Sequence, residues 1–280
     1  MPLAQIKNIF IPFTPDQEGH LTAAVSYGLS LAEKAKAHVT FRVFGHHYDT
    51  PYSPAPEFVG ALVGPANAAE KQRVEKAEAA LKGQLASSGL SCDVRSAQLS
   101  QAEAIDLCAA QGRLHDLTIV DSPAEQFAMA RALAEELLFH TGRPVMVVPA
   151  GVMAFKAKRI LVAWDGTARA ARALNDAMPM LTSAEYVELA SVLKEKDLSR
   201  LVPGAEAAPH LSRHGINATV VNLNAADGDA GKALRGRATL AGADMIVMGA
   251  FAHSRWRQII LGGVTSSMLS ASEIPVFLSR

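Results

Sequence analysis

The stretch RILVAWDGT, residues 159–167, passes from a run of apolar residues into a polar turn. A short apolar run bounded by turn residues is typical of a buried strand. The segment that follows, residues 169–180, places Ala171, Leu174 and Met178 on one face of a helix. The stretch therefore predicts a strand, a turn and a helix, which together form the repeating unit of open α/β sheets.

The first half of the chain repeats this unit. The run NIFIPF at residues 8–13 is apolar, and helical spacing follows it at residues 22–36. Both halves also end alike, because a proline and an apolar run close them at residues 144–148 and 275–278. Proline is tolerated at the first position of a strand, where its missing donor falls outside the hydrogen-bond ladder. The chain is therefore predicted to hold two copies of one unit.

Strands and helices alternate between these ends. Further strands are expected at residues 39–44, 91–97, 115–120, 187–193, 218–223 and 243–248, and helices at 69–87, 102–111, 125–141 and 228–240. This alternation predicts an α/β fold of two parallel sheets with right-handed crossovers, each of about five strands. The breaker-rich stretch 149–152 places the domains at residues 1–150 and 151–280, called here the first and second halves.

Residues 46–65 differ from the rest of the chain. They contain four prolines and two tyrosines, and no regular apolar spacing. Such a composition predicts a long surface loop, and long loops in compact domains are often functional.

The composition excludes several classes of protein. The 280 residues include 27 Lys and Arg against 27 Asp and Glu, so no overall basic excess indicates a nucleic-acid or membrane surface. No uninterrupted run of about 18 apolar residues predicts a membrane span, and the first residues do not form a secretion signal. The two cysteines have no CxxC spacing and indicate ordinary thiols, so the cytoplasm is the expected location.

The chemistry of such a fold is expected where the strand order reverses. For strands in the order 3-2-1-4-5, this point lies beyond the ends of strands one and four. Asp165 follows strand one of the second half, where its carboxylate could hydrogen-bond a ribose or hold a phosphate-bound metal; its alternative role is to form the turn and cap the helix. After strand four, Gly249 leaves the strand and Gly262-Gly263 open a helix whose amides favour an anion.

The stretch at residues 248–265 resembles the phosphate-binding signature of universal stress proteins, G-x2-G-x9-G-(S/T). Gly249 and Gly262 fill the first and third glycines of this signature. Ala252 replaces the second glycine, and Gly263 replaces the Ser or Thr. The opening ILVAWDGT is similar to strand one of the family, and the first half has the same layout, so the whole chain resembles the tandem type.

The resemblance implies two tandem Rossmann-like domains of the adenine nucleotide alpha hydrolase type. It also implies a stress-response or regulatory protein that binds ATP, with or without Mg²⁺, or a related adenine nucleotide in the second half. The residues that it implies at the nucleotide are Ala163, Trp164, Asp165, Val192, Gly249, Ala252, Gly262, Gly263, Val264 and Thr265. Ala163 and Trp164 would lie against the adenosine.

The first half lacks the matching residues. Thr14 stands where Asp165 stands in the second half, and no glycine-rich loop follows strand four. Asp121 and Glu125 occupy that place and would repel phosphate. We therefore expect no nucleotide in the first half, which would serve as a built-in dimer partner or bind something else through residues 46–65. Residues 145–148 are expected to pair with 276–278 inside the chain, and a further homodimer is left open.

No motif predicts catalysis. The sequence has no GxSxG elbow and no Walker pattern, so it predicts at most very slow ATP hydrolysis. The pairs His46-His47 and His210/His214 lack the partners of a known metal motif, and no metal site is expected. Two other interpretations stay open. One is a nucleotide-free scaffold of the same fold, and the other is a flavoprotein or adenylating enzyme of another doubly wound family.

Overall fold

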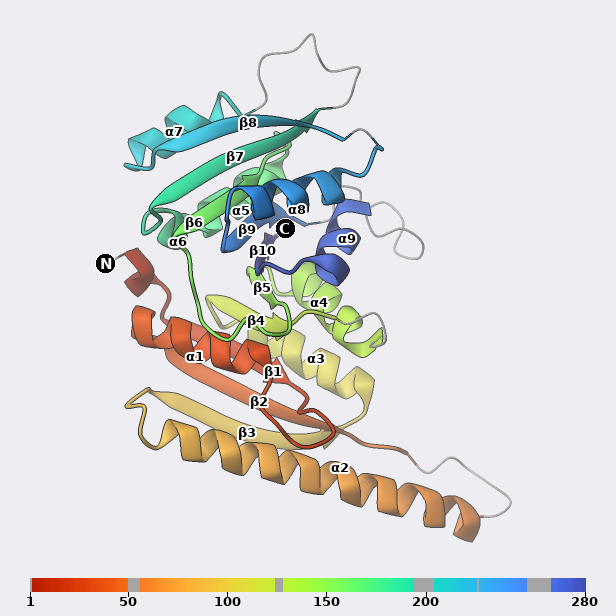
Figure 1. Cartoon of the computed structure of the whole chain (residues 1–280). Coiled ribbons are helices and arrows are strands. Elements are labelled where there is room, and N and C mark those ends of the chain that lie inside the picture. The colour runs from red at the N-terminus through yellow and green to blue at the C-terminus, as the bar shows by residue number, and fades with distance from the viewer. Residues whose placement is uncertain (1, 50–55, 124–127, 194–203, 226, 251–262) are drawn as a thin grey trace.

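All ten strands of the computed structural model lie in a single sheet, in the order β3-β2-β1-β4-β5-β10-β9-β6-β7-β8 (Figure 1). The structure describes residues 2–49, 56–123, 128–193, 204–225, 227–250 and 263–280. The strands are β1 (Asn8–Phe13), β2 (His38–His46), β3 (Cys92–Leu99), β4 (Leu117–Asp121), β5 (Val145–Val148), β6 (Arg159–Ala163), β7 (Tyr186–Leu193), β8 (Ala218–Asn224), β9 (Met245–Gly249) and β10 (Val276–Ser279). The order 3-2-1-4-5 predicted for each half is confirmed, because β8, β7, β6, β9 and β10 repeat the arrangement of β3, β2, β1, β4 and β5.

The two halves join through β5 and β10. These strands are antiparallel, with Met146 opposite Phe277, whereas the pairs within each half are parallel. Both side chains are buried, so the junction belongs to the core. The predicted pairing inside the chain is therefore confirmed.

Helices cover both faces of the sheet. They are α1 (Ala23–Ala35), α2 (Pro56–Leu85), α3 (Gln101–Gly112), α4 (Ala128–His140), α5 (Ala168–Asp176), α6 (Met178–Leu181), α7 (Ala207–Arg213), α8 (Ala230–Leu240) and α9 (Gly263–Ala271), after a 3-10 turn at Pro2–Gln5. One apolar cluster packs α1, α2, α5, α6 and α7 on one face, and a second packs α3, α4, α8 and α9 on the other. Strand alternation explains the division: in β1, Ile9 and Ile11 enter the first cluster and Phe10 enters the second.

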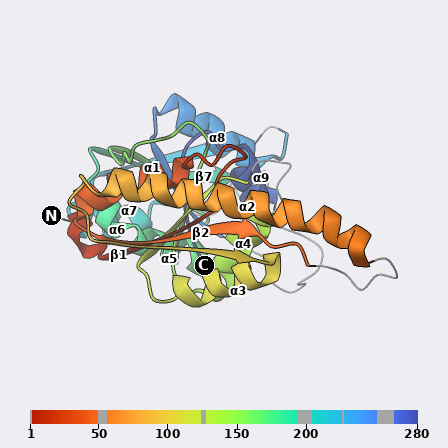
Figure 2. The same ribbon diagram turned by 90° about the horizontal axis from the view of Figure 1, so that it is seen from below.

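The predicted loop at residues 46–65 is wrong from Pro56 onward. Helix α2 begins at Pro56 and runs for 30 residues. Proline is well suited to the first turn of a helix, where its missing N–H has no partner to lose. Pro65 lacks the N–H that would bond the Ala61 carbonyl one turn earlier, but Ala61 is exposed, so water can satisfy that carbonyl. Figure 2 shows α2 extending past the sheet. Residues 50–55 lie outside the described part of the chain.

The single helix expected over residues 169–180 is also wrong in detail. Helix α5 ends at Asp176, and the short helix α6 starts at Met178. Pro179 explains the break, because it lacks the N–H that would continue the ladder of α5. The start of α5 is fixed by Thr167, whose hydroxyl accepts a hydrogen bond from the Ala170 amide at 3.2 Å.

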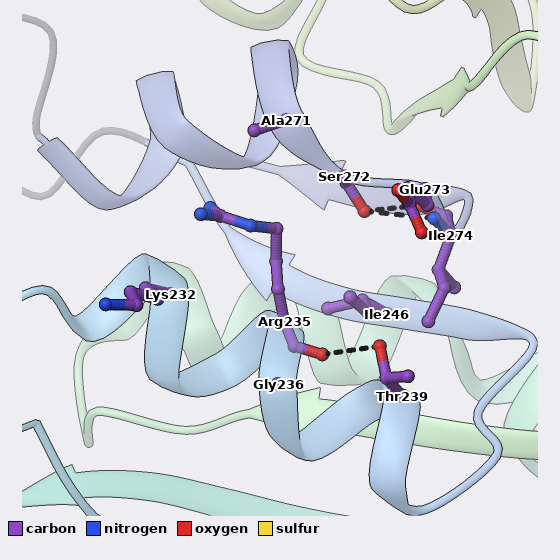
Figure 3. A pocket seen from close by; sticks show the side chains of 9 residues that line it. All are labelled: Lys232, Arg235, Gly236, Thr239, Ile246, Ala271, Ser272, Glu273 and Ile274. Carbon is purple, nitrogen blue, oxygen red and sulfur yellow. Dashed lines mark hydrogen bonds between the residues drawn. The ribbon is translucent and has the colours of Figure 1, made fainter.

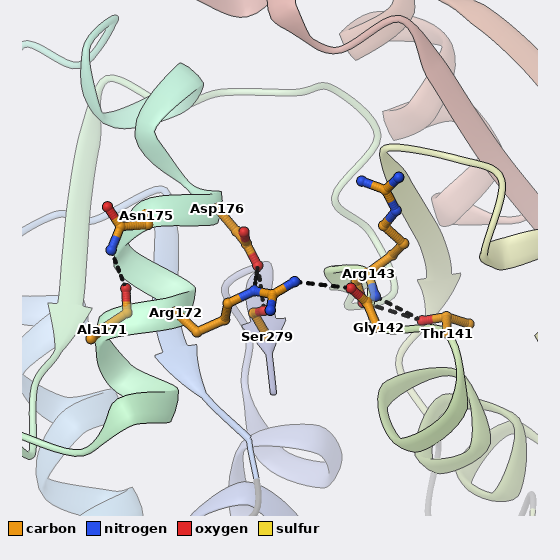
Figure 4. Close-up of polar contacts among 8 residues, drawn as sticks. All are labelled: Thr141, Gly142, Arg143, Ala171, Arg172, Asn175, Asp176 and Ser279. Carbon is orange, nitrogen blue, oxygen red and sulfur yellow. Dashed lines mark hydrogen bonds and ion pairs between the residues drawn. The ribbon is translucent and has the colours of Figure 1, made fainter.

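Side chains also connect the halves. The Nη2 of Arg172 in α5 donates to the carbonyl of Gly142, in the turn between α4 and β5, at 3.1 Å (Figure 4). Asp176 holds the guanidinium with an Nε–Oδ2 distance of 3.0 Å. The hydroxyl of Ser279 in β10 donates to the same carboxylate oxygen at 2.5 Å. The first and second halves therefore form one continuous packing unit.

Candidate functional site

The strand order of the second half reverses between β6 and β9. These strands are direct neighbours, with Ala163 opposite Met248. The remaining strands of the half lie on both sides of this pair: β7 and β8 follow beside β6, and β10 lies beside β9. Open parallel sheets bind ligands at such a point, beyond the carboxyl ends of the strands. The predicted residues that follow β6 and β9 therefore converge on one edge.

Asp165 lies in the turn that connects β6 to α5. Its Oδ1 accepts hydrogen bonds from the Thr167 amide at 3.0 Å and the Thr167 hydroxyl at 2.7 Å. Gly166 between them has a φ of 73°, a conformation that favours glycine. The turn-forming role, which the sequence left open as the alternative, is therefore present. Asp165 is exposed, so its carboxylate is also accessible to solvent.

Gly249, the last residue of β9, lies against the start of α5. A Cβ built on this residue would meet the Ala170 nitrogen at 2.7 Å and the Arg169 carbonyl carbon at 2.7 Å. Both neighbours are backbone atoms, so they cannot move aside as a side chain could. The glycine therefore lets the N-terminus of α5 approach the end of β9.

Gly249→Ala is expected to destabilise the fold by about 1–3 kcal/mol, because the new methyl group overlaps helix backbone. Gly263→Ala provides the matched control, since a Cβ there meets no atom of the described residues within 4 Å. Alanine also favours helices, so this variant should be unchanged or up to about 1 kcal/mol more stable. Urea denaturation measures both. Equal stabilities for the two variants would contradict the close approach at Gly249.

The start of α9 brings three further predicted residues together. Gly263 is exposed in the first turn, Val264 packs on the second cluster, and Thr265 is 4% exposed. The first amides of a helix have no partner within it and attract anions. Ala252 and Gly262, the remaining glycine-signature positions after Gly249, lie outside the described residues.

The nucleotide-site residues predicted on β6 and β7 and directly after β6 divide between the faces of the sheet. Ala163 and Val192 pack with the second cluster, on the face that carries α9. Trp164 packs with the first cluster, and its amide donates to the Ala190 carbonyl at 2.8 Å. A ligand at this edge would therefore meet Trp164 from one face and Ala163 from the other.

The first half uses the equivalent edge differently. Asp121 ends β4 as Gly249 ends β9, and its Oδ1 accepts a hydrogen bond from the Ala24 amide at 2.9 Å. Ala24 lies in the first turn of α1, so a carboxylate of the protein holds the place that an anion would take. Burial raises the pKa of Asp121, and the bond from Ala24 opposes that rise. Thr14 is exposed, and Glu125 lies outside the described residues.

The sequence predicted that Asp121 repels phosphate, but it did not indicate the hydrogen bond with Ala24. Aligning the last residues of β4 and β9 could have indicated it, because a carboxylate that replaces a close-packed glycine needs a partner. Thr167 was missed as the cap of α5, although its position directly before the helix was the available signal.

A pocket of about 260 Å³ lies between α8 and the end of α9 (Figure 3). It is lined by Lys232, Arg235, Gly236, Thr239, Ile246, Ala271, Ser272, Glu273 and Ile274. Its cations already have partners, because Lys232 pairs with Asp227 at 2.8 Å and Arg235 donates to the Ser267 carbonyl at 3.2 Å. None of the predicted nucleotide-site residues that the structure describes lines this pocket. The pocket is therefore separate from the carboxyl ends of β6 and β9 and the residues that follow them, called the β6–β9 edge below.

The histidine pairs do not form a metal centre in the described residues. The ring centroids of His210 and His214 lie 4.9 Å apart, and His47 Nε2 is 3.8 Å from Asp49 Oδ1. Across the described ranges, no three His, Cys, Asp or Glu side chains gather closely enough to hold a metal ion. Within the same ranges, no helix combines the length and apolar character that a membrane span requires.

Comparison with known families identifies the second half. Residues 156–280 match the model described as "Universal stress protein family". This part of the chain is a universal stress protein domain. The match contains every residue of the β6–β9 edge, and it begins three residues before β6, the first strand of the second half. The predicted resemblance is therefore confirmed where the signature lies.

Solved structures extend the likeness to the whole chain. A universal stress protein from Archaeoglobus fulgidus DSM 4304 is 16% identical, with a TM-score of 0.65 and 99% of each chain covered. A functionally unknown protein from Pseudomonas aeruginosa PAO1 is 15% identical, with a TM-score of 0.61, covering 99% of this chain and 93% of its own. A search of curated proteins finds no match. These full-length likenesses show that the first half shares the universal stress protein fold.

Proposed function

We propose that this protein binds ATP, or a related adenine nucleotide, at the β6–β9 edge of its second half and acts as a cytoplasmic stress-response or regulatory protein. The observation that carries the proposal is that Asp165 follows β6 and Gly249 ends β9, two neighbouring parallel strands between which the strand order reverses. Such an edge is the ligand-binding place of open α/β sheets. Membership of residues 156–280 in the universal stress protein family supports the proposal.

Each part of the edge suits one part of the ligand. The first turn of α9, where Gly263 is exposed, would offer its amides to the phosphates, and no described residue lies within 4 Å of a Cβ built on Gly263. The Asp165 carboxylate would hydrogen-bond the ribose or hold a phosphate-bound Mg²⁺, since oxygen ligands suit that ion. Ala163, Trp164 and Val192 would border the adenosine. The sequence signature adds Ala252 and Gly262, which lie outside the described residues, and Val264 and Thr265 in the first turn of α9, where Thr265 is buried.

We propose one nucleotide per chain. The first half, residues 1–150, would bind none, because the Asp121 carboxylate already accepts from the Ala24 amide. A phosphate brought to the same amides would meet a negative charge at close range. The second half, residues 151–280, would hold the only site, and binding without efficient turnover is expected, with at most very slow hydrolysis.

Calorimetric titration with Mg-ATP tests the proposal, with Asp165→Asn as the informative variant. Asparagine keeps an oxygen that can accept from Thr167, so the turn should survive while the negative charge is lost. We expect one site per chain, weakened about tenfold or more in the variant. Thr14→Val, at the matching exposed position of the first half, should leave binding unchanged.

One observation favours a nucleotide-free scaffold as the second candidate. Asp165 is already engaged by Thr167, so its present geometry is explained without a ligand. The absence of heat with Mg-ATP, ADP and AMP, in protein shown to be free of carried-over nucleotide, would favour this candidate. A thermal stabilisation by any of them would favour nucleotide binding.

A further inference from the structure

Helix α9 is fixed to the first half at its carboxyl end. Ser122 follows β4, and its amide donates to the Val148 carbonyl at 2.7 Å. Its hydroxyl donates to the carbonyl of Leu269 at 2.7 Å. Leu269 lies in the last turn of α9, where carbonyls have no partner within the helix. Ser122 therefore satisfies, from the first half, a buried acceptor that α9 cannot satisfy itself.

A second contact reaches the first turn of α9. The Nη2 of Arg131 in α4 donates to the hydroxyl of Ser266 at 3.1 Å. Glu135 holds the guanidinium through an Nε–Oε1 distance of 2.9 Å, one helical turn away. Figure 1 shows α4 and α9 side by side across the junction of the halves. The first half thus contacts α9 at Ser266 in its first turn and at Leu269 in its last turn.

The other side of α9 is held within its own half. Arg235 of α8 donates to the Ser267 carbonyl at 3.2 Å and also bonds its hydroxyl. Gly231 of α8 lies so close that an added Cβ would meet the Ser267 Oγ at 2.8 Å. Helix α8 contacts α9 at Ser267, and the first half contacts it at Ser266 and Leu269. The orientation of α9 therefore depends on both halves.

We infer that the first half positions α9, through Ser122 and Arg131, and thereby sets the affinity of the second half for nucleotide. This inference rests on the proposed function, since α9 would carry the phosphate-binding amides. Ser122 and Arg131 act as positioning residues: they bond the helix rather than the ligand. The first half then contributes to binding although it holds no nucleotide itself.

Hydrogen exchange of the α9 amides tests the positioning without any ligand. Ser122→Ala and Arg131→Met each remove one hydrogen bond to α9, and exchange across residues 263–271 should become about fivefold faster. The matched controls remove hydrogen bonds that lie entirely within the first half. Ser88 donates to the Leu85 carbonyl, and Arg113 donates to the His140 carbonyl. Ser88→Ala and Arg113→Met should leave α9 exchange unchanged, and β6 should remain protected in all four variants.

Titration with Mg-ATP then tests the consequence for binding. Affinity should fall about fivefold in Ser122→Ala and Arg131→Met, remain unchanged in the controls, and recover in part in Arg131→Lys, which keeps a donor. Unchanged α9 exchange in both variants, or exchange that rises equally in the controls, would overturn the inference. Normal affinity despite faster α9 exchange would overturn its binding part. Failure of the wild type to bind would overturn the proposed function instead, while the exchange result would still decide the positioning.

Discussion

Gly263→Asp is expected to abolish nucleotide binding without weakening the fold. Gly263 is exposed in the first turn of α9, and within the part of the chain that the structure describes an added Cβ meets nothing within 4 Å. An aspartate there also interacts favourably with the helix dipole, by about 0.3–1 kcal/mol. A phosphate at the same amides would lie near the new carboxylate. Two like charges about 4 Å apart cost about 4 kcal/mol near a protein surface, which corresponds to a loss of about a thousandfold in affinity.

Gly263→Asn is the control for this prediction, because asparagine matches the size of aspartate and carries no charge. It should weaken Mg-ATP binding by less than about tenfold, while both variants match or exceed the wild type in urea denaturation. Calorimetry on the three proteins separates charge from shape. If Gly263→Asp bound Mg-ATP within a few-fold of the wild type, the phosphates would not lie at α9 and the proposed site would be wrong.

Much of the fold could be predicted from the sequence because it depends on repetition. The apolar runs at residues 8–13 and 159–163 each form the first β-strand of one half of the single sheet, and the structure confirms the same strand order in both halves. The pairing of residues 145–148 with 276–278 followed from the same logic, since each run ends its half. Periodic burial is a signal carried by many residues at once, so single exceptions do not hide it.

Features that depend on one residue were harder to predict. Pro56 starts a helix, although the prolines around it indicated a loop. In the first turn of a helix, the N–H that proline lacks would have no partner within the helix, so proline is tolerated there. The Asp121 carboxylate faces an amide of α1 that lies 97 positions away in the sequence, and no local pattern marks such a pair. The sequence located the candidate site by its motif, whereas its contacts with the first half required the structure.

Glu188 is another residue whose role no local pattern reveals, because it interrupts the apolar run of β7. Its side chain is fully buried, and Arg237 of α8 donates to its two oxygens at 2.7 and 2.8 Å. The Tyr186 hydroxyl donates to the same carboxylate at 2.9 Å. The bonds from Arg237 hold the pKa of Glu188 below its ordinary range, despite the opposing effect of burial. The ion pair between Glu188 and Arg237 therefore links α8 to β7 of the sheet.

Arg237→Met is therefore expected to cost about 3–5 kcal/mol at pH 7, because it leaves a buried carboxylate without its cation. Lys158→Met is the matched control: it breaks a pair with Glu185 in which both side chains are about two-thirds exposed, and should cost less than about 1 kcal/mol. Replacing both partners, in Glu188→Leu with Arg237→Met, should recover much of the stability, because no charge remains buried.

The pH dependence of the same variant separates charge from packing. The depressed pKa of Glu188 contributes stability to the wild type above the unfolded value of about 4.3, and this contribution is lost as the pH falls through the lower folded pKa. In Arg237→Met the carboxyl can protonate at higher pH, so its deficit against the wild type should narrow from pH 7 toward pH 4. Urea denaturation at several pH values measures this difference. A deficit that stays constant down to pH 4 would mean that Arg237 stabilises the fold through the packing of its aliphatic stem rather than through its charge.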